Sequence, residues 1–129
     1  MNSTVRRLSL VLGVIAFPTP GVAEPFLVRD GEPNAEIVVA GKPARAAEFG
    51  AQELQTYLKK ITGARLEIVT APTEQAGLRI YVGESEHARR AGVSADGLER
   101  DAFRMIAGED WLALVGNDLE FEPREPWAR

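Results

Sequence analysis

The chain has 129 residues, a formal net charge of −4 and no cysteine. Its 45% hydrophobic and 26% charged residues are typical of a globular protein with a core, which excludes a wholly disordered chain. The acidic balance argues against nucleic-acid binding, which depends on clustered Lys and Arg. Without cysteine, disulfides and thiolate sites are excluded, and the single histidine, His87, excludes a multi-histidine metal site.

The first 23 residues have the pattern of a secretory signal peptide. Arg6 and Arg7 precede an apolar run from Leu8 to Phe17, and Ala23 supplies a small residue at the expected cleavage site. The run is shorter than the roughly 20 apolar residues of a spanning helix, so no permanent membrane anchor is predicted. We therefore expect an exported protein, periplasmic or extracellular, with residues 1–23 removed.

Two short apolar runs open the remaining sequence. Phe26–Val28 and Ile37–Ala40 predict strands, and the turn-forming residues from Arg29 to Asn34 between them suggest that the two strands form a hairpin.

The segment from Ala44 to Thr62 predicts the longest element, an amphipathic helix. Its apolar residues recur at alternating intervals of four and three, the spacing of one helix face. These residues are Ala47, Ala51, Leu54, Leu58 and Ile61. Gly63 is suited to end the helix in a left-handed conformation, and Lys59 and Lys60 favour its C-terminal dipole.

The second half of the sequence predicts two more strands, a short helix and two final strands. Leu66–Val69 is a strand, and Leu78–Val82 has the period-two pattern of another. Glu84–Ala91 predicts a short helix. Phe103–Ala107 and Trp111–Val115 predict a hairpin, and the unbroken apolar run of its second strand indicates burial on both faces.

This order of elements predicts the α/β class. We expect a single small domain over residues 24–118, with a mixed β-sheet covered by one long amphipathic helix and a shorter helix. Residues 119–129, which carry two prolines and no regular period, are expected to be an irregular, truncated tail.

Four segments resemble the N-terminal, non-catalytic domain of bacterial alpha-glucuronidases and beta-hexosaminidase-like glycoside hydrolases. The helix from Ala46 to Ala64 is similar to the helix that opens that domain. Ile80–Ser85 resembles the family's strand end, and Asp101–Ile106 with Leu112–Asp118 resembles its final hairpin. The order and spacing of the segments, which span nearly all of residues 26–118, carry the resemblance.

The resemblance implies a non-catalytic accessory domain of an exported carbohydrate-processing protein. In these families the domain packs beside a catalytic (β/α) barrel that carries the reactive residues, and it continues after its last strand into another helix. This sequence departs from that pattern over residues 119–129. The expected partners are a catalytic barrel domain or a carbohydrate. The alternatives are a stand-alone carbohydrate-binding or interaction module and, less favoured, a small hydrolase.

Acidic pairs near strand ends are the first candidates for catalysis, since glycoside hydrolysis needs two carboxyl groups about 5–10 Å apart. Two such pairs of carboxyl groups occur near strand ends: Glu84 with Glu86, and Asp118 with Glu120. The simpler interpretation is that Glu84 and Glu86 begin a helix, where acids favour the dipole, and that Asp118 is a turn residue.

Ser85 and His87 are a second candidate pair, but no recognisable motif places them as nucleophile and base. The turns at Gly83–Ser85 and Gly116–Asp118 lack the glycine spacing and the lysine of a phosphate-binding loop. We therefore predict no catalytic, cofactor-binding or metal-ligating residue, and no activity of the chain on its own.

Overall fold

Strands and two helices make up the described part of the chain, which is residues 26–118 of the computed structural model. The predicted signal peptide and the predicted tail lie outside the described residues. The strands are β1 Val28–Arg29, β2 Glu32–Pro33, β3 Ala35–Val38, β4 Ile68–Val69, β5 Leu78–Val82, β6 Phe103–Ala107 and β7 Trp111–Gly116. The helices are α1 Arg45–Thr62 and α2 Glu86–Arg90.

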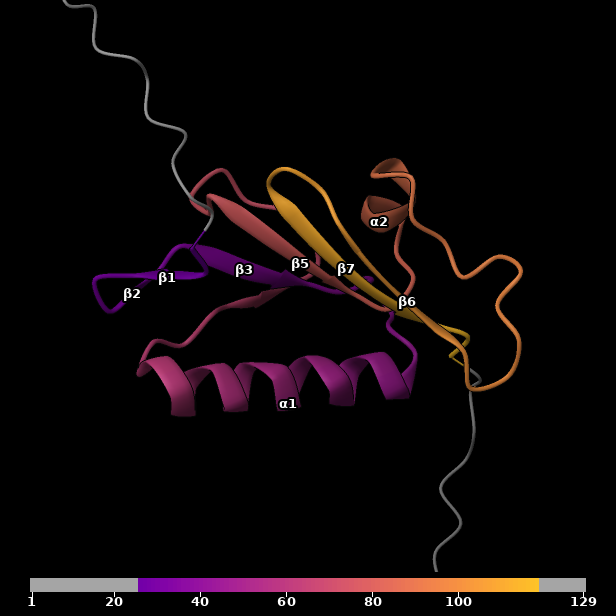
Figure 1. Cartoon of the computed structure of the whole chain (residues 1–129), viewed down its shortest axis with the longest axis horizontal. Helices are drawn as coiled ribbons and strands as arrows, with labels where there is room; N and C mark the ends of the chain where they lie inside the picture. The colour runs from indigo at the N-terminus through magenta and orange to yellow at the C-terminus, as the bar shows by residue number, and fades with distance from the viewer. Residues whose placement is uncertain (1–25, 119–129) are drawn as a thin grey trace, which may run out of the picture.

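A five-stranded mixed sheet with the order β4-β3-β5-β7-β6 forms the centre of the fold. Strands β4, β3, β5 and β7 are parallel to one another, whereas β6 runs antiparallel to β7 at one edge. Figure 1 shows α1 and α2 on opposite sides of this sheet. A small mixed sheet with two helices agrees with the predicted α/β class.

Helix α1 packs against one face of the sheet because its small residues allow a close approach. Ala47 and Ala51 are buried, and Leu54 and Leu58 are partly buried against the same core. Alternate residues of β3 and β5, together with Val39 after β3 and Leu66 before β4, supply the rest of this core. The buried members are Ala35, Ile37, Val39, Leu66, Leu78, Ile80 and Val82.

Helix α2 covers part of the opposite face. Ala88 is fully buried there with Val38, Ala113 and Val115. Ser85 begins α2 as its N-cap, since its Oγ accepts a hydrogen bond of 3.0 Å from the Ala88 amide. The side chain of Ser85 therefore satisfies an amide that the helix itself leaves without a partner.

The predicted long helix is present, and its C-terminus has the predicted geometry. Gly63 adopts a φ of 80° and its amide bonds to the Lys59 carbonyl. The predicted apolar face was wrong at its last position, because Ile61 is 79% exposed. Ile61 lies in the last turn of α1, two residues before the C-cap Gly63, where its side chain faces solvent.

The predicted hairpin near residue 26 was wrong in its partners. β1 pairs with β2 and not with β3, because Asp30 and Gly31 both take positive φ angles, 53° and 84°, and close a two-residue turn. The segment 29–34 was predicted to be only a turn, yet it contains most of this small sheet. β3 also begins two residues earlier than predicted, at Ala35.

The predicted strand 66–69 is shortened to Ile68–Val69. The Leu66 carbonyl instead accepts a hydrogen bond of 2.6 Å from the Gln55 side chain on α1, while the Leu66 side chain is fully buried. The predicted hairpin of β6 and β7 is confirmed, and β7 lies inside the sheet between β5 and β6. No helix within residues 26–118 combines the length and apolar character needed to cross a membrane.

Candidate functional site at the edge of the sheet

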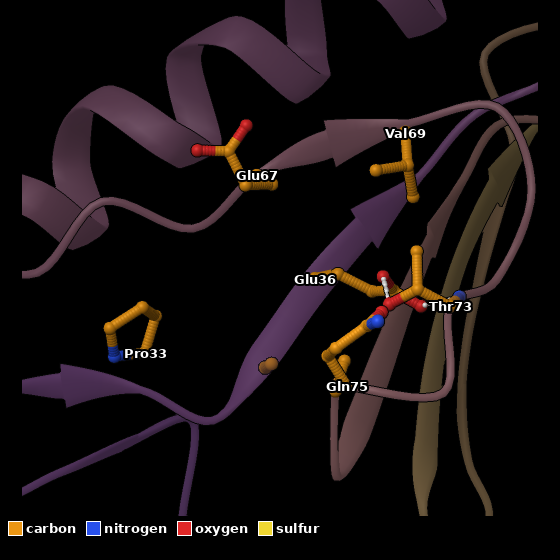
Figure 2. A pocket seen from close by; sticks show the side chains of 8 residues that line it. Pro33, Glu36, Glu67, Val69, Thr73 and Gln75 are labelled. Atoms are coloured by element: carbon orange, nitrogen blue, oxygen red, sulfur yellow. Dashed lines mark hydrogen bonds between the residues drawn. The ribbon is translucent and has the colours of Figure 1, made fainter.

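A hollow of about 300 Å³ lies over the edge of the sheet where β3 meets β4 and the loop 70–77. Figure 2 shows its wall from β3 on one side and from the loop on the other. Its lining residues are Pro33, Ala35, Glu36, Glu67, Val69, Thr73, Gln75 and Ala76. The hollow contains a buried carboxylate, which is a group that proteins keep only with partners.

Glu36 is the carboxylate, and it is only 3% exposed. Its Oε1 accepts a hydrogen bond of 2.8 Å from the Thr73 amide, and its Oε2 accepts one of 2.7 Å from the Thr73 hydroxyl. Figure 2 shows Thr73 directly over the end of the Glu36 side chain. Both oxygens are therefore engaged by one residue of the loop 70–77, so Glu36 fastens that loop to β3.

Arg79 of β5 extends the same network across the sheet. Its Nε lies 3.8 Å from Glu36 Oε1, and one terminal nitrogen lies 3.2 Å from Asp110 Oδ2. The other terminal nitrogen donates a hydrogen bond of 3.1 Å to the Thr73 carbonyl. A planar guanidinium with several donors suits this role, because it can join three groups in fixed directions. Arg79 thus connects the loop 70–77 with the turn between β6 and β7.

Tyr81 and Trp111 pack beside this network on the α2 side of the sheet. Their ring centroids are 6.3 Å apart at an angle of 56°, a tilted arrangement that aromatic pairs favour. Burial raises the pKa of the Tyr81 hydroxyl, against the opposing effect of the nearby Arg79 charge. The hydroxyl therefore stays neutral and does not serve as a base near neutral pH.

The network has the chemistry of a structural latch. The Glu36 carboxylate is buried and both of its oxygens accept hydrogen bonds from Thr73, so its contacts hold the loop 70–77 in place. Among residues 26–118, no three His, Cys, Asp or Glu side chains gather where they could hold a metal ion. Every buried side-chain nitrogen and oxygen in this part of the chain has a hydrogen-bond partner.

Comparisons with protein-family models, with curated proteins and with solved structures find no match to this chain. Its chemistry must therefore be inferred from its own side chains.

The structure does not assemble the acidic pairs that the sequence offered. Glu84 bonds to the Ala95 amide and to Arg89, both at 3.0 Å, and Glu86 pairs with Arg90. Glu120 lies outside the described residues.

Ser85 and His87 do not form a nucleophile and base pair either. Ser85 is buried and caps α2, whereas His87 lines a shallow hollow with Tyr81 and Arg90. No hydrogen bond between Ser85 and His87 is present.

Glu84 and Asp118 are brought near one another because they follow neighbouring parallel strands, β5 and β7. Burial raises the pKa of the Asp118 carboxyl, and the Glu84 charge raises it further. The folded protein thus holds this proton more tightly than the unfolded chain does. Ionised Asp118 consequently costs stability at neutral pH, and the cost disappears as pH falls through the raised pKa and below the ordinary value of 3.8.

We expect Asp118→Asn to be more stable than the wild type at pH 7. The stability advantage of the variant should shrink steadily on acidification. It should vanish below the ordinary carboxyl pKa, because Asp118 is then protonated in both the folded and the unfolded wild type. Urea unfolding across that pH range measures it, with Asp96→Asn as a control for the same change in net charge at an exposed site. A wild type that is the more stable protein at pH 7 would refute this account.

The latch was not predicted from the sequence. Glu36 lies between the turn-forming residues that end at Asn34 and the predicted strand Ile37–Ala40, and so belongs to neither predicted element. The available signal was its position two residues before Val38 in the period of a strand, which places it on the same face as Val38. Its partner Thr73 is 37 residues away, and no spacing rule connects them.

Proposed function

We propose that this chain is a single accessory α/β domain of an exported, glycoside hydrolase-like protein of the alpha-glucuronidase or hexosaminidase type. It has no catalytic role of its own, and it acts by packing against a catalytic barrel. The observation that carries the proposal is a set of exposed apolar side chains on the α1 side of the sheet, which we call the α1–β6 surface. It consists of Tyr57, Ile61, Phe103 and Met105, which are 55%, 79%, 75% and 67% exposed.

One flank of α1 forms half of this surface. A β-carbon at Gly50 would lie 3.8 Å from Val82 of β5. Because β3 separates β5 from β4, the flank of α1 that carries Gly50 is the one that points away from β4. Tyr57 and Ile61 follow Gly50 by seven and eleven residues, which are two and three helical turns. They therefore lie on the same flank as Gly50, beside the part of the sheet that α1 leaves uncovered.

β6 forms the other half of this surface. Met105 pairs with Leu114, and Leu114 packs against the α1-side core. Directly paired residues share a face of the sheet, so Met105 and, two residues away, Phe103 are on the α1 face. Exposed large apolar side chains on the same side of a domain suit a protein contact surface.

The latch supports an accessory role for the domain. The buried carboxylate is used to fasten a loop, and Glu84 and Glu86 after β5 are used in a loop hydrogen bond and in ion pairs. A domain of this kind offers a rigid surface and not a reaction centre, in keeping with the resemblance to a non-catalytic N-terminal domain.

A second candidate is a stand-alone carbohydrate-binding or interaction module, and exposed aromatic rings favour it. Phe49, Tyr57 and Phe103 are all more than half exposed, and aromatic faces can stack on sugar rings. One face of Tyr57 is occupied, however, since the Lys60 ammonium lies 4.9 Å from its ring centroid. Stacking of a sugar ring on Tyr57 is therefore restricted to its other face.

Thermal unfolding with added ligands separates the two candidates, because only a ligand of the folded state raises the transition temperature. We expect a rise of several degrees with a purified alpha-glucuronidase barrel that lacks its own N-terminal domain. Xylan-derived uronic-acid oligosaccharides and chitooligosaccharides should leave the transition unchanged. A rise with one sugar class and none with the barrel would replace the proposal by the carbohydrate-binding module.

A further inference from the structure

The edge strand β6 carries a row of backbone groups that face away from the sheet. At its two ends, the Gly108 amide bonds to the Trp111 carbonyl and the Asn117 amide bonds to the Ala102 carbonyl. In an antiparallel pair, the residues that bond to the partner alternate with residues that do not. Arg104 and Ile106 therefore bond to β7, whereas the amides and carbonyls of Phe103, Met105 and Ala107 point outward.

The protein does little to protect this edge. Soluble proteins blunt exposed edges with charged side chains, proline, bulges or very short strands. β6 has five residues, no proline and one charge, Arg104. The Arg104 guanidinium is occupied, because it donates to the Ser94 and Asp96 carbonyls at 2.6 and 2.9 Å. The opposite edge strand, β4, has only two residues and offers no comparable row.

The pattern of β6 is symmetric about Met105, and from this symmetry we propose that two copies of the chain associate by antiparallel pairing of β6 with β6. With Met105 opposite Met105 of the second copy, Phe103 faces Ala107, and every outward amide meets an outward carbonyl. Each such pair exchanges two hydrogen bonds. A two-fold axis relates the copies, so the contact is self-complementary and closed.

The side chains agree with the same register. Arg104 lies opposite Ile106 of the second copy, so the two arginines do not face each other. Phe103 and Met105, which are 75% and 67% exposed in one copy, join those of the second copy on the α1 face. Beyond the strand, Asp101 comes opposite Glu109, an exposed like-charge pair that salt screens. The paired strands thus lose apolar exposure at the cost of a weak, peripheral repulsion.

This inference goes beyond the proposed function and is tested on the chain alone, although it shares Phe103 and Met105 with the α1–β6 surface. Sedimentation velocity of the purified full chain over a concentration series up to about 100 µM tests it, because dimer formation follows mass action. We expect the wild type to approach twice the mass of one chain. A wild type that stays monomeric throughout would overturn the proposal.

Met105→Pro is the sharpest variant, because the amide that proline removes points outward and not to β7. Proline is tolerated at such edge positions, so the sheet of each copy stays intact. Met105→Lys is the second variant, and it places two ammonium groups together at the axis. Both should weaken the dimer at least tenfold, whereas Phe49→Lys, with the same charge on exposed α1, should not. The proposed register would be overturned if Phe49→Lys weakened the dimer as much as the Met105 variants do. It would also be overturned if neither Met105 variant weakened the dimer.

Amide hydrogen exchange gives a readout that a general loss of stability does not produce. In dilute monomer, Phe103, Met105 and Ala107 should exchange quickly while Arg104 and Ile106 are protected by β7. In the dimer, all five amides should be protected. Unchanged exchange at the three outward amides of the concentrated protein would contradict pairing through β6.

Discussion

Gly83→Ala is expected to lower the free energy of unfolding by about 2–4 kcal/mol, from left-handed backbone strain and overpacking together. Gly83 adopts a φ of 72°, and an added β-carbon would lie 2.4 Å from the Ala47 β-carbon on α1. Ala47 is buried and belongs to the contact of α1 with the sheet, so neither partner can move without opening that contact. Urea unfolding followed by far-ultraviolet circular dichroism measures the loss.

Gly92→Ala is the matched control for this variant. Gly92 has a φ of 82°, similar to that of Gly83, but an added β-carbon would meet nothing within 4 Å. Its substitution therefore carries only the backbone strain of about 1–2 kcal/mol. The difference between the two variants isolates the clash with Ala47. Equal losses in both would show that α1 does not pack closely on the end of β5.

Glu36→Ala is expected to cost about 2–3 kcal/mol, at or below the low end of the roughly 3–5 kcal/mol for breaking a buried ion pair, because Arg79 is partly exposed to solvent and also pairs with Asp110. The change removes both acceptors of the Thr73 hydrogen bonds and the partner of the Arg79 guanidinium. The loop 70–77 should also become sensitive to proteolysis. Urea unfolding and limited proteolysis of the folded variant measure these two effects.

Glu36→Gln separates hydrogen bonding from charge at the same position. The glutamine side-chain carbonyl can still accept a hydrogen bond from the Thr73 amide. The NH2 of the same side-chain amide can donate a hydrogen bond to the Thr73 hydroxyl oxygen. We expect a loss of about 1 kcal/mol or less and a loop that resists proteolysis as in the wild type. If Glu36→Gln were as damaging as Glu36→Ala, the charge facing Arg79 and not the hydrogen bonding would hold the loop.

The elements that could be predicted from the sequence are those with a local signal. The spacing of Ala47, Ala51, Leu54 and Leu58 defines α1, and Gly63 ends it by a rule that involves only neighbouring residues. The same holds for the hairpin of β6 and β7. The hairpin at Asp30 was missed because its turn was interpreted as part of a longer loop and its two-residue strands have no period to detect.

The latch and the α1–β6 surface could not be predicted in this way. Glu36, Thr73 and Arg79 come together only through the pairing of β3 with β5, which depends on the whole sheet. Ile61 has the spacing of a core residue, and its exposure results from what lies opposite it. Sequence periodicity identifies which face of a helix is apolar, but not which neighbour covers that face.

Calorimetric titration of the purified alpha-glucuronidase barrel into the chain tests the packing role most directly. We expect binding to the wild type, at least tenfold weaker binding to Ile61→Lys, and wild-type binding to Gln52→Lys, which adds the same charge to the opposite flank of α1. No binding to the wild type, or the same affinity for all three proteins, would contradict a domain that works by packing through the α1–β6 surface.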